Sequence, residues 1–365
     1  MINIPKHSRK VIVVQNVIPN YRKDFFNRIM SERELIKLYS SKENELGIKS
    51  VDINYEYYSD LKLKSLGKYI IWQECSTYLS TIRKDDVLVL SGNPRIISNY
   101  IAIAIAKFKG AKTVCWSHGW TAGSHGLLAK LRIKLMSLYD AILLYTEKEA
   151  HKFESDGLFS GGIYYLNNGL DYEKIKSARD KTHVKKDHEK TTLIFCGRLT
   201  EKSNIEMLIQ AFELLDDSFR LFIVGDGVLF SKCTSMVKEK KLTNITLVGA
   251  IDDEEKLAQY FNLADAFVYP GKVGLSLIHA FGYMLPAIIH DNDINQMPEF
   301  AASNNDNTIY FSENCIASLI SAINSFGQLT LSERRRMSEM ACNEARLKFN
   351  IEKMKENFLT MVDSV

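Results

Sequence analysis

The feature that most restricts the fold of this sequence is a repeated alternation of short apolar runs with longer mixed segments. In the first half the runs are Val11–Gln15, Leu35–Tyr39, Tyr69–Trp72, Val87–Leu90, Thr113–Trp116, Ala141–Tyr145 and Ile163–Leu166. In the second half they are Thr192–Cys196, Leu221–Val224, Ile245–Val248, Ala266–Tyr269 and Ala287–His290. Strand-like runs that alternate with helical segments indicate βαβ units and parallel sheets. The two series therefore predict an α/β protein with two doubly wound, Rossmann-like domains.

The length and the polar stretches place the domain boundaries. A chain of 365 residues, 46% of them hydrophobic, suits two domains of about 170 residues. Residues 171–191 are polar and charge-dense and have no apolar periodicity, which is typical of an exposed linker. We expect a first domain over 1–170 and a second over 192–349. Residues 350–365 are expected to form a C-terminal helix that can pack back on the first domain.

The composition also indicates where the protein works. There is no apolar run of 18 residues, and residues 1–6 lack the apolar core of a signal peptide. The six cysteines are scattered, with no CxxC pair and no histidine spacing suited to zinc. These features predict a cytoplasmic protein with reduced thiols.

The charge distribution is asymmetric. Residues 1–180 hold 27 Lys and Arg against 19 Asp and Glu, whereas the remainder holds 20 against 25. A basic half favours an anionic partner, such as an acidic membrane surface or a pyrophosphate-linked lipid, although a solvated basic face is an equal alternative. The segment 127–136 alternates basic and apolar residues, as at a membrane surface or in a helix packed on its own sheet. Nucleic acid is the least favoured partner, because no aromatic platform interleaves with the basic residues.

Four loops of the second half follow strands, where open α/β sheets bind ligands. The first carries Gly197, Arg198 and Lys202, and its two cations can neutralise a diphosphate leaving group. The second and third carry Gly225 and Gly249, and a flat base can lie against the backbone after the second of these glycines. Each of these loops, taken alone, also reads as an ordinary turn.

The fourth loop, at 270–274, is the most informative. A helix is expected to begin near Leu275, so the N–H groups of Gly274, Leu275 and Ser276 can form a phosphate site. His279 lies one turn into this helix, within reach of a ribose; a partly buried structural histidine is the alternative.

The order of these motifs resembles the C-terminal domain of the family 4 glycosyltransferases. The motifs are Gly-Arg-Leu, Gly-Asp-Gly, Gly249 with acidic residues after it, Pro-Gly-x-Val-Gly-Leu-Ser with Ile-His-Ala, and Gly-x-x-x-Pro; the resemblance covers residues 163–350. It implies the GT-B fold, with two domains that face each other across a cleft. It also implies a nucleotide-diphospho-sugar donor in that cleft and transfer with retention of configuration. No metal is implied as obligatory, because cationic side chains and helix N-termini replace it.

The sequence departs from the family pattern at its catalytic positions. The family's acidic pair falls on Gly271 and His279, so the identity of the donor sugar is open. The family's lysine falls on Ser203, one residue after Lys202; either Lys202 or Lys272 can supply the charge. Bacterial surface-polysaccharide enzymes with a similar Pro-Gly-x-Val-Gly-Leu and His-Ala pattern suggest a subgroup.

Two loops of the first half are the candidates for the acceptor side. Pro19, Asn20 and Tyr21 follow a strand and open a helix. His118 and Gly119, with Trp120, follow another strand, so His118 can hydrogen-bond the donor sugar or position the acceptor hydroxyl. A structural turn histidine is an equal alternative.

Together these patterns predict a retaining glycosyltransferase that moves a sugar from a UDP- or GDP-sugar to a glycan or lipid-linked glycan, in lipopolysaccharide or capsule synthesis at the inner face of the membrane. The expected catalytic residues are Arg198, Lys202 and His118. The expected donor-binding residues are Gly197, Gly225, Gly249, Ala250, Ile251, Gly271, Lys272, Val273, Gly274, Leu275, Ser276 and His279. Two alternatives stay open: a catalytically silent subunit that binds a nucleotide sugar or a protein partner, and a sugar-nucleotide epimerase of the same fold.

Overall fold

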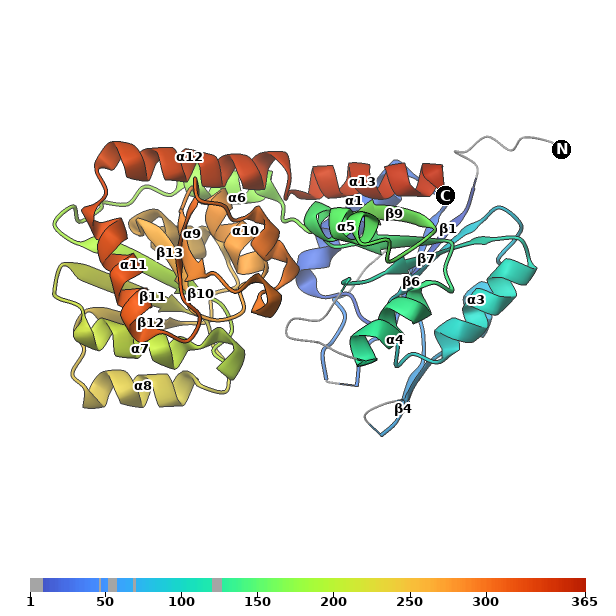
Figure 1. Cartoon of the computed structure of the whole chain (residues 1–365), viewed down its shortest axis with the longest axis horizontal. Coiled ribbons are helices and arrows are strands. Elements are labelled where there is room, and N and C mark those ends of the chain that lie inside the picture. The colour runs from blue at the N-terminus through green and yellow to red at the C-terminus, as the bar shows by residue number, and fades with distance from the viewer. Residues whose placement is uncertain (1–8, 46, 52–57, 68–69, 120–126) are drawn as a thin grey trace. The chain divides into compact units, whose positions relative to one another are not determined.

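The computed structural model describes residues 9–45, 47–51, 58–67, 70–119 and 127–365, with the backbone alone at 127–129. The chain divides into two compact units, Met1–Asn167 with Ile351–Val365, and Asn168–Asn350 (Figure 1). The N-terminal residues 1–6 and Trp120, considered above, lie outside the described residues. None of the helices in the described ranges combines the length and the apolar character that a membrane span requires.

The first unit is built on a seven-stranded sheet in the order β3-β2-β1-β6-β7-β8-β9, and every neighbouring pair is parallel. Its strands are β1 Val11–Gln15, β2 Ile36–Ser40, β3 Tyr58–Asp60, β6 Val87–Ser91, β7 Lys112–Trp116, β8 Ala141–Leu144 and β9 Gly162–Tyr165. Alternate residues of the central strands enter two different cores, so both faces of the sheet are buried. This is why the strands read as continuous apolar runs.

Helices cover both faces of this sheet. On one face α1 Asn20–Glu32 packs against the C-terminal helix α13 Ile351–Ser364. On the other lie α2 Ser76–Leu79, α3 Ser98–Phe108, α4 Leu127–Met136 and α5 Glu147–Ser155. A separate antiparallel hairpin joins β4 Leu63–Leu66 to β5 Ile70–Gln73.

The second unit has a six-stranded parallel sheet in the order β12-β11-β10-β13-β14-β15. Its strands are β10 Thr191–Cys196, β11 Phe219–Val224, β12 Ile245–Gly249, β13 Ala266–Tyr269, β14 Ala287–His290 and β15 Thr308–Phe311. One face carries α6 Tyr172–Lys181, α9 Glu254–Leu263, α10 Leu275–Gly282 and α12 Leu331–Leu347; the other carries α7 Ile205–Leu214, α8 Phe230–Glu239 and α11 Ile316–Gln328 (Figure 1). Short 3₁₀ turns are η2 Glu201–Ser203, η3 Asp293–Asn295 and η4 Pro298–Ala302. The prediction of two doubly wound, Rossmann-like units is confirmed.

Three details differ from the sequence-based expectation. The linker expected over 171–191 instead contains α6, whose Tyr172, Ile175 and Ala178 are buried in the core of the second unit. Strand β15 follows β14, which we had expected to be the last strand. Of the run expected as a sheet strand at 69–72, Tyr69 lies outside the described residues, and residues 70–72 belong to β5, which pairs with β4 and not with the main sheet. In β5 every second residue is buried, and in α6 every third. Neither segment has the continuous apolar run that marks the central strands, so apolar runs alone did not identify these two elements correctly.

Candidate functional site

The loops after β10, β11, β12 and β13 form one hydrogen-bonded layer at the C-terminal edge of the second sheet. Backbone N–H groups donate across this layer from Gly197 to Val224 O (3.0 Å), Leu199 to Asp226 O (2.9 Å), Gly225 to Gly249 O (2.8 Å) and Lys272 to Lys202 O (2.9 Å). The strand order reverses between β10 and β13, and open α/β sheets bind ligands at such a point. Because the loops hold one another, the layer is ordered without a ligand.

Two glycines allow these loops to pack. A Cβ atom on Gly225 would lie 1.9 Å from Gly197 O, and one on Gly271 would lie 2.1 Å from Lys202 O. Gly271 therefore has no room for the carboxylate that the resemblance places there. Gly249 differs: its φ is +86° and nothing lies within 4 Å of an added Cβ, so only its backbone conformation favours glycine.

The expected cations lie at this edge of the sheet. Arg198 and Lys202 are exposed. Ser203, at the position of the family's lysine, is fully buried and its Oγ donates to Thr200 O at 2.6 Å. Burial raises the pKa of Tyr269 to about 12, and the nearby charge of Arg198 opposes this rise. The local turn thus directs Lys202, and not residue 203, toward solvent.

The start of α10 is the predicted phosphate site. Gly274 is its N-cap, and no side chain caps the helix. The N–H of Val273 already donates to the buried Gln296 at 2.7 Å. The buried Glu299 is close, with its Oε2 3.6 Å from an added Cβ on Gly274. An acidic side chain beside this helix end weakens its attraction for an anion, so the charge of Arg198 and Lys202 becomes more important.

His279 is held by a carboxylate that the sequence analysis did not identify. Its Nε2 bonds to Glu254 Oε1 at 2.7 Å, and the Tyr283 hydroxyl donates to the same oxygen at 2.7 Å. Burial acts to raise the pKa of Glu254, but the bonds from His279 and Tyr283 outweigh it and lower this pKa. Burial, followed by the charge of Glu254, raises the pKa of Cys196 to about 12, which places this carboxylate near the end of β10.

The first unit gathers its candidates at the corresponding edge of its own sheet. The His118 ring, just after β7, stacks on Tyr145 at 3.9 Å between centroids. Burial, with the charges of Arg132 and Arg22, lowers the pKa of His118 to about 3, so the imidazole is neutral at pH 7. Its buried Nδ1 has no hydrogen-bond partner within the described ranges.

The other first-unit candidates are arranged differently. Gly119 is part of a closed turn, because its N–H donates to Glu149 Oε1 at 3.0 Å and an added Cβ would lie 2.6 Å from Phe153. Pro19 is the N-cap of α1, and no side-chain bond caps that helix. Asn20 and the half-exposed Tyr21 form its first turn.

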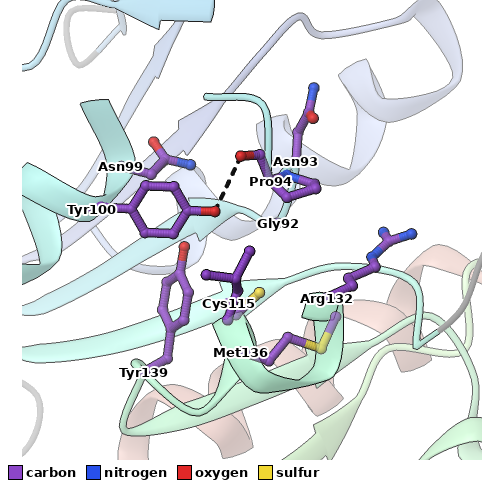
Figure 2. A pocket seen from close by; sticks show the side chains of 10 residues that line it. Gly92, Asn93, Pro94, Asn99, Tyr100, Cys115, Arg132, Met136 and Tyr139 are labelled. Carbon is purple, nitrogen blue, oxygen red and sulfur yellow. Dashed lines mark hydrogen bonds between the residues drawn. The ribbon is translucent and has the colours of Figure 1, made fainter. Parts of the chain in front are cut away.

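A small cavity lies beside this cluster, at the loop that follows β6 (Figure 2). Gly92, Pro94 and Cys115 line it, and Arg132 stands at its edge. Its volume of about 10 Å³ is enough for one water molecule. The Tyr100 hydroxyl donates to Pro94 O at 3.1 Å across one side. A sugar therefore does not fit in this cavity.

The sequence of the second unit is similar to that of a known enzyme family. Residues 176–343 match the sequence profile of the family described as glycosyl transferases group 1. The match covers most of the second unit, Asn168–Asn350. The match includes all four loops of the layer, together with Glu254 and His279. This profile match, together with the GT-B fold that the chain shares with solved structures, identifies the protein as a glycosyltransferase.

Solved glycosyltransferase structures show the same fold over almost the whole chain. A glycosyltransferase from Rickettsia africae aligns with a TM-score of 0.69 at 12% identity, covering 98% of both chains. HepE from Anabaena in complex with UDP aligns with a TM-score of 0.69 at 12% identity, covering 98% of this chain and 100% of that one. The lipopolysaccharide outer core galactosyltransferase WaaB aligns with a TM-score of 0.68 at 14% identity, covering 97% and 99%. No curated protein sequence matches the chain.

The structure therefore divides the predicted residues of this glycosyltransferase between its units. Those expected to bind the donor or the diphosphate gather at the edge of the second sheet, and His118 and Pro19–Tyr21 gather at the edge of the first. Sequence reasoning missed Glu254 and Arg22. Each lies at the start of a helix that follows a strand-end loop, and the strand-end rule applied to every charged residue would have found both.

Proposed function

We propose that this glycosyltransferase moves a sugar, with retention, from a UDP- or GDP-sugar to a glycan or lipid-linked glycan in surface polysaccharide synthesis. One observation carries the proposal: the ordered loop layer presents Arg198 and Lys202 beside the point where the strand order reverses. The Anabaena relative, solved with UDP, supports a nucleotide donor, and WaaB supports a surface-glycan acceptor.

Sugar transfer requires stabilisation of the negative charge that develops on the diphosphate leaving group. The bond between the anomeric carbon and the diphosphate oxygen breaks, and the acceptor oxygen forms its bond on the same face. The acceptor proton passes to an oxygen of the departing diphosphate. Arg198 and Lys202 stabilise the charge that develops there, and such a contribution is typically worth 10²–10³-fold in rate. In this proposal these cations serve in place of an obligatory metal, and His118 positions the acceptor hydroxyl as a neutral group.

The donor ribose is assigned to Glu254 with His279. The Nε2 of His279 already bonds to Glu254 and is not available to a ribose hydroxyl. The charged carboxylate of Glu254 can accept further hydrogen bonds, so we assign the ribose hydroxyls to it. Tyr283 bonds the same oxygen and fixes the carboxylate rotamer. This arrangement supplies a carboxylate from α9 at a position where the family resemblance expects one from α10.

A cytoplasmic location at the inner face of the membrane forms part of the proposal. It rests on the basic balance of residues 1–180 and on the alternating basic and apolar residues of α4. Sedimentation with anionic vesicles, compared with neutral ones, measures it.

The second candidate function is a silent subunit that binds a nucleotide sugar without turnover. The lack of room for a side chain at Gly271 favours this silent subunit, because the carboxylate with which the family contacts the sugar has no equivalent at this position. Calorimetry with UDP- and GDP-sugars beside a hydrolysis assay separates the two: tight binding without hydrolysis or transfer, with any acceptor tried, indicates the silent subunit. Product analysis without an acceptor tests the epimerase alternative.

The main experiment compares Arg198→Ala with Arg220→Ala. Arg220 lies near the start of β11, away from the C-terminal edge, and pairs with Asp187 on the surface. We expect turnover to fall 10²–10³-fold in the first variant and to change less than twofold in the second. Unchanged turnover in Arg198→Ala would remove its proposed role. Thermal stabilisation by a panel of nucleotide sugars identifies the donor beforehand.

A further inference from the structure

Arg22 is a buried cation that has no ion pair with any described residue. It is 5% exposed, at the third residue of α1. Its Nη1 is buried without a hydrogen-bond partner, and it forms no ion pair in the part of the chain that the structure describes. The guanidinium Cζ instead lies 4.7 Å from the Trp116 ring centroid and 5.2 Å from that of Tyr145. Stacking on rings offsets only part of the cost of burying a charge.

Two neighbouring groups also contain buried polar atoms without a hydrogen-bond partner among the described residues. Trp116 is 3% exposed, and its Nε1 has no hydrogen-bond partner among the described residues. The Nδ1 of His118, whose ring stacks on the same Tyr145, has none either. Buried polar groups are nearly always satisfied, so the two unpaired donors of Arg22 and Trp116, with His118 Nδ1 beside them, indicate a missing hydrogen-bonding partner.

Glu149, the acidic side chain that bonds to the turn after His118, is already engaged. Glu149 accepts hydrogen bonds from Gly119 N–H, Thr146 N–H and the Thr146 hydroxyl, and it completes the capping box of α5. Arg132 adds a second cation to the cluster, and its Nη2 donates to Ser117 Oγ at 3.0 Å. The start of α1, which no side chain caps, adds the positive end of a helix of 13 residues. Arg22 is thus the cation of this cluster that has no ion pair among the described residues.

We propose that the first unit binds a phosphate-type anion between Arg22, Trp116 and His118. A phosphate accepts several hydrogen bonds at once and matches the planar guanidinium of arginine. The site lies at the C-terminal edge of β7 and β8, where this class of sheet binds ligands. The first unit also holds 26 Lys and Arg against 19 Asp and Glu, which favours an anionic ligand.

The assignment of this anion to a substrate rests on the proposed function. In a glycosyltransferase whose second unit takes the donor, the anion belongs to the acceptor, which is then phosphorylated or diphosphate-linked. Two sources share this chemistry: a polyprenyl diphosphate that carries the growing glycan, and a free sugar phosphate.

The test measures inorganic pyrophosphate binding to the full chain by calorimetry, with saturating UDP present to occupy the donor loops. Arg22→Met keeps the apolar stem and removes the charge and its donors. Arg83→Gln is the control, because Arg83 is an exposed arginine of the same unit. We expect at least tenfold weaker pyrophosphate binding in Arg22→Met and no change in Arg83→Gln. We also expect the melting temperature of Arg22→Met without ligand to equal or exceed that of the natural chain, because a buried unpaired charge is removed. Pyrophosphate binding that survives in Arg22→Met overturns the proposal.

A second variant covers the case in which Arg22→Met does not fold. Trp116→Phe keeps an aromatic ring and removes the indole N–H together with part of the ring, and we expect a threefold to tenfold loss of pyrophosphate affinity; unchanged affinity overturns the proposal. If UDP does not bind at all, the donor assignment fails separately, and the same titrations on Arg198→Ala still test the anion site. Flotation with phosphatidylcholine vesicles that contain a polyprenyl diphosphate then separates the sources. Arg22-dependent flotation identifies the lipid, and Arg22-dependent pyrophosphate binding without flotation identifies a soluble phosphate.

Discussion

The two units share one topology but differ in how the polar groups at the sheet edge are satisfied. In the second unit the loops hydrogen-bond to one another through backbone groups, and the cations Arg198 and Lys202 stand in solvent. In the first unit Arg22 is buried against aromatic rings, beside polar atoms of Trp116 and His118 that lack a hydrogen-bond partner within the described ranges. Backbone hydrogen bonds join the loops of the second edge, whereas the cluster at the first edge contains buried polar atoms of Arg22, Trp116 and His118 that have no partner among the described residues.

This difference predicts different responses to ligands. Binding of a ligand to a preorganised layer requires little further ordering of the loops. Mutations in such a layer therefore change stability through packing, or change affinity through direct contact with the ligand. A cluster with unsatisfied donors carries a desolvation penalty that the ligand relieves. Mutations in the loop layer should therefore destabilise the free protein, and removal of the buried cation should not.

The largest expected effect tests the packing of the loop layer. Gly225→Ala places a Cβ 1.9 Å from Gly197 O at a φ of +140°, so the two loops must separate. We expect a loss of about 3 kcal/mol, which lowers the melting temperature by roughly 6–12 °C. Thermal unfolding followed by circular dichroism measures it. A melting temperature within 2 °C of the natural chain would show that the layer is not tightly packed.

The next effect tests whether the second edge contacts its donor through Glu254. Glu254→Gln keeps the size of the side chain but removes the charge that His279 and Tyr283 bind. We expect about tenfold weaker UDP binding, in line with a hydrogen bond to a charged group. Glu255→Gln is the matched control, because the adjacent Glu255 is exposed. Equal affinities in the two variants would remove Glu254 from the donor site.

Much of the fold could be predicted from the sequence, because buried parallel strands are continuous apolar runs. Runs such as 87–90 and 266–269 coincide with β6 and β13 to within a residue. Helix α6 was missed because only Tyr172, Ile175 and Ala178 of its ten residues face the core. The charge density of its solvent face made the segment resemble a linker.

The candidate site could be predicted only where the signal was local. The loops around Gly225 and Gly271 were found because strand, glycine and helix follow one another in the sequence. Glu254 and His279 lie on different helices and are 25 residues apart in the sequence. Arg22 and Trp116 are 94 residues apart. Such pairs depend on the tertiary arrangement, which no local pattern encodes.

The third prediction concerns pH and the first unit. The pKa of His118 is about 3 in the fold and near 6.5 in an unfolded chain, so between these values the unfolded state binds the proton. The free energy of unfolding therefore rises with pH through this window and falls as the pH drops from about 6.5 toward 3. His118→Asn should flatten this dependence between pH 7.5 and pH 5, as measured by urea midpoints, and the exposed His151→Asn should not. An unchanged slope in His118→Asn would mean that the histidine is solvated.

The smallest expected effect separates the two reasons for a glycine in the loop layer. Gly249→Ala adds a Cβ where nothing lies within 4 Å, so the variant meets only the cost of a φ of +86°, about 1 kcal/mol. Because the new methyl projects into open space beside the exposed Ala250, it tests whether a base lies there. If a nucleotide base packs on this loop, UDP binding should weaken more than the small loss of stability explains. If UDP binding is unchanged, the base lies elsewhere along the edge, and Gly249 serves the turn alone.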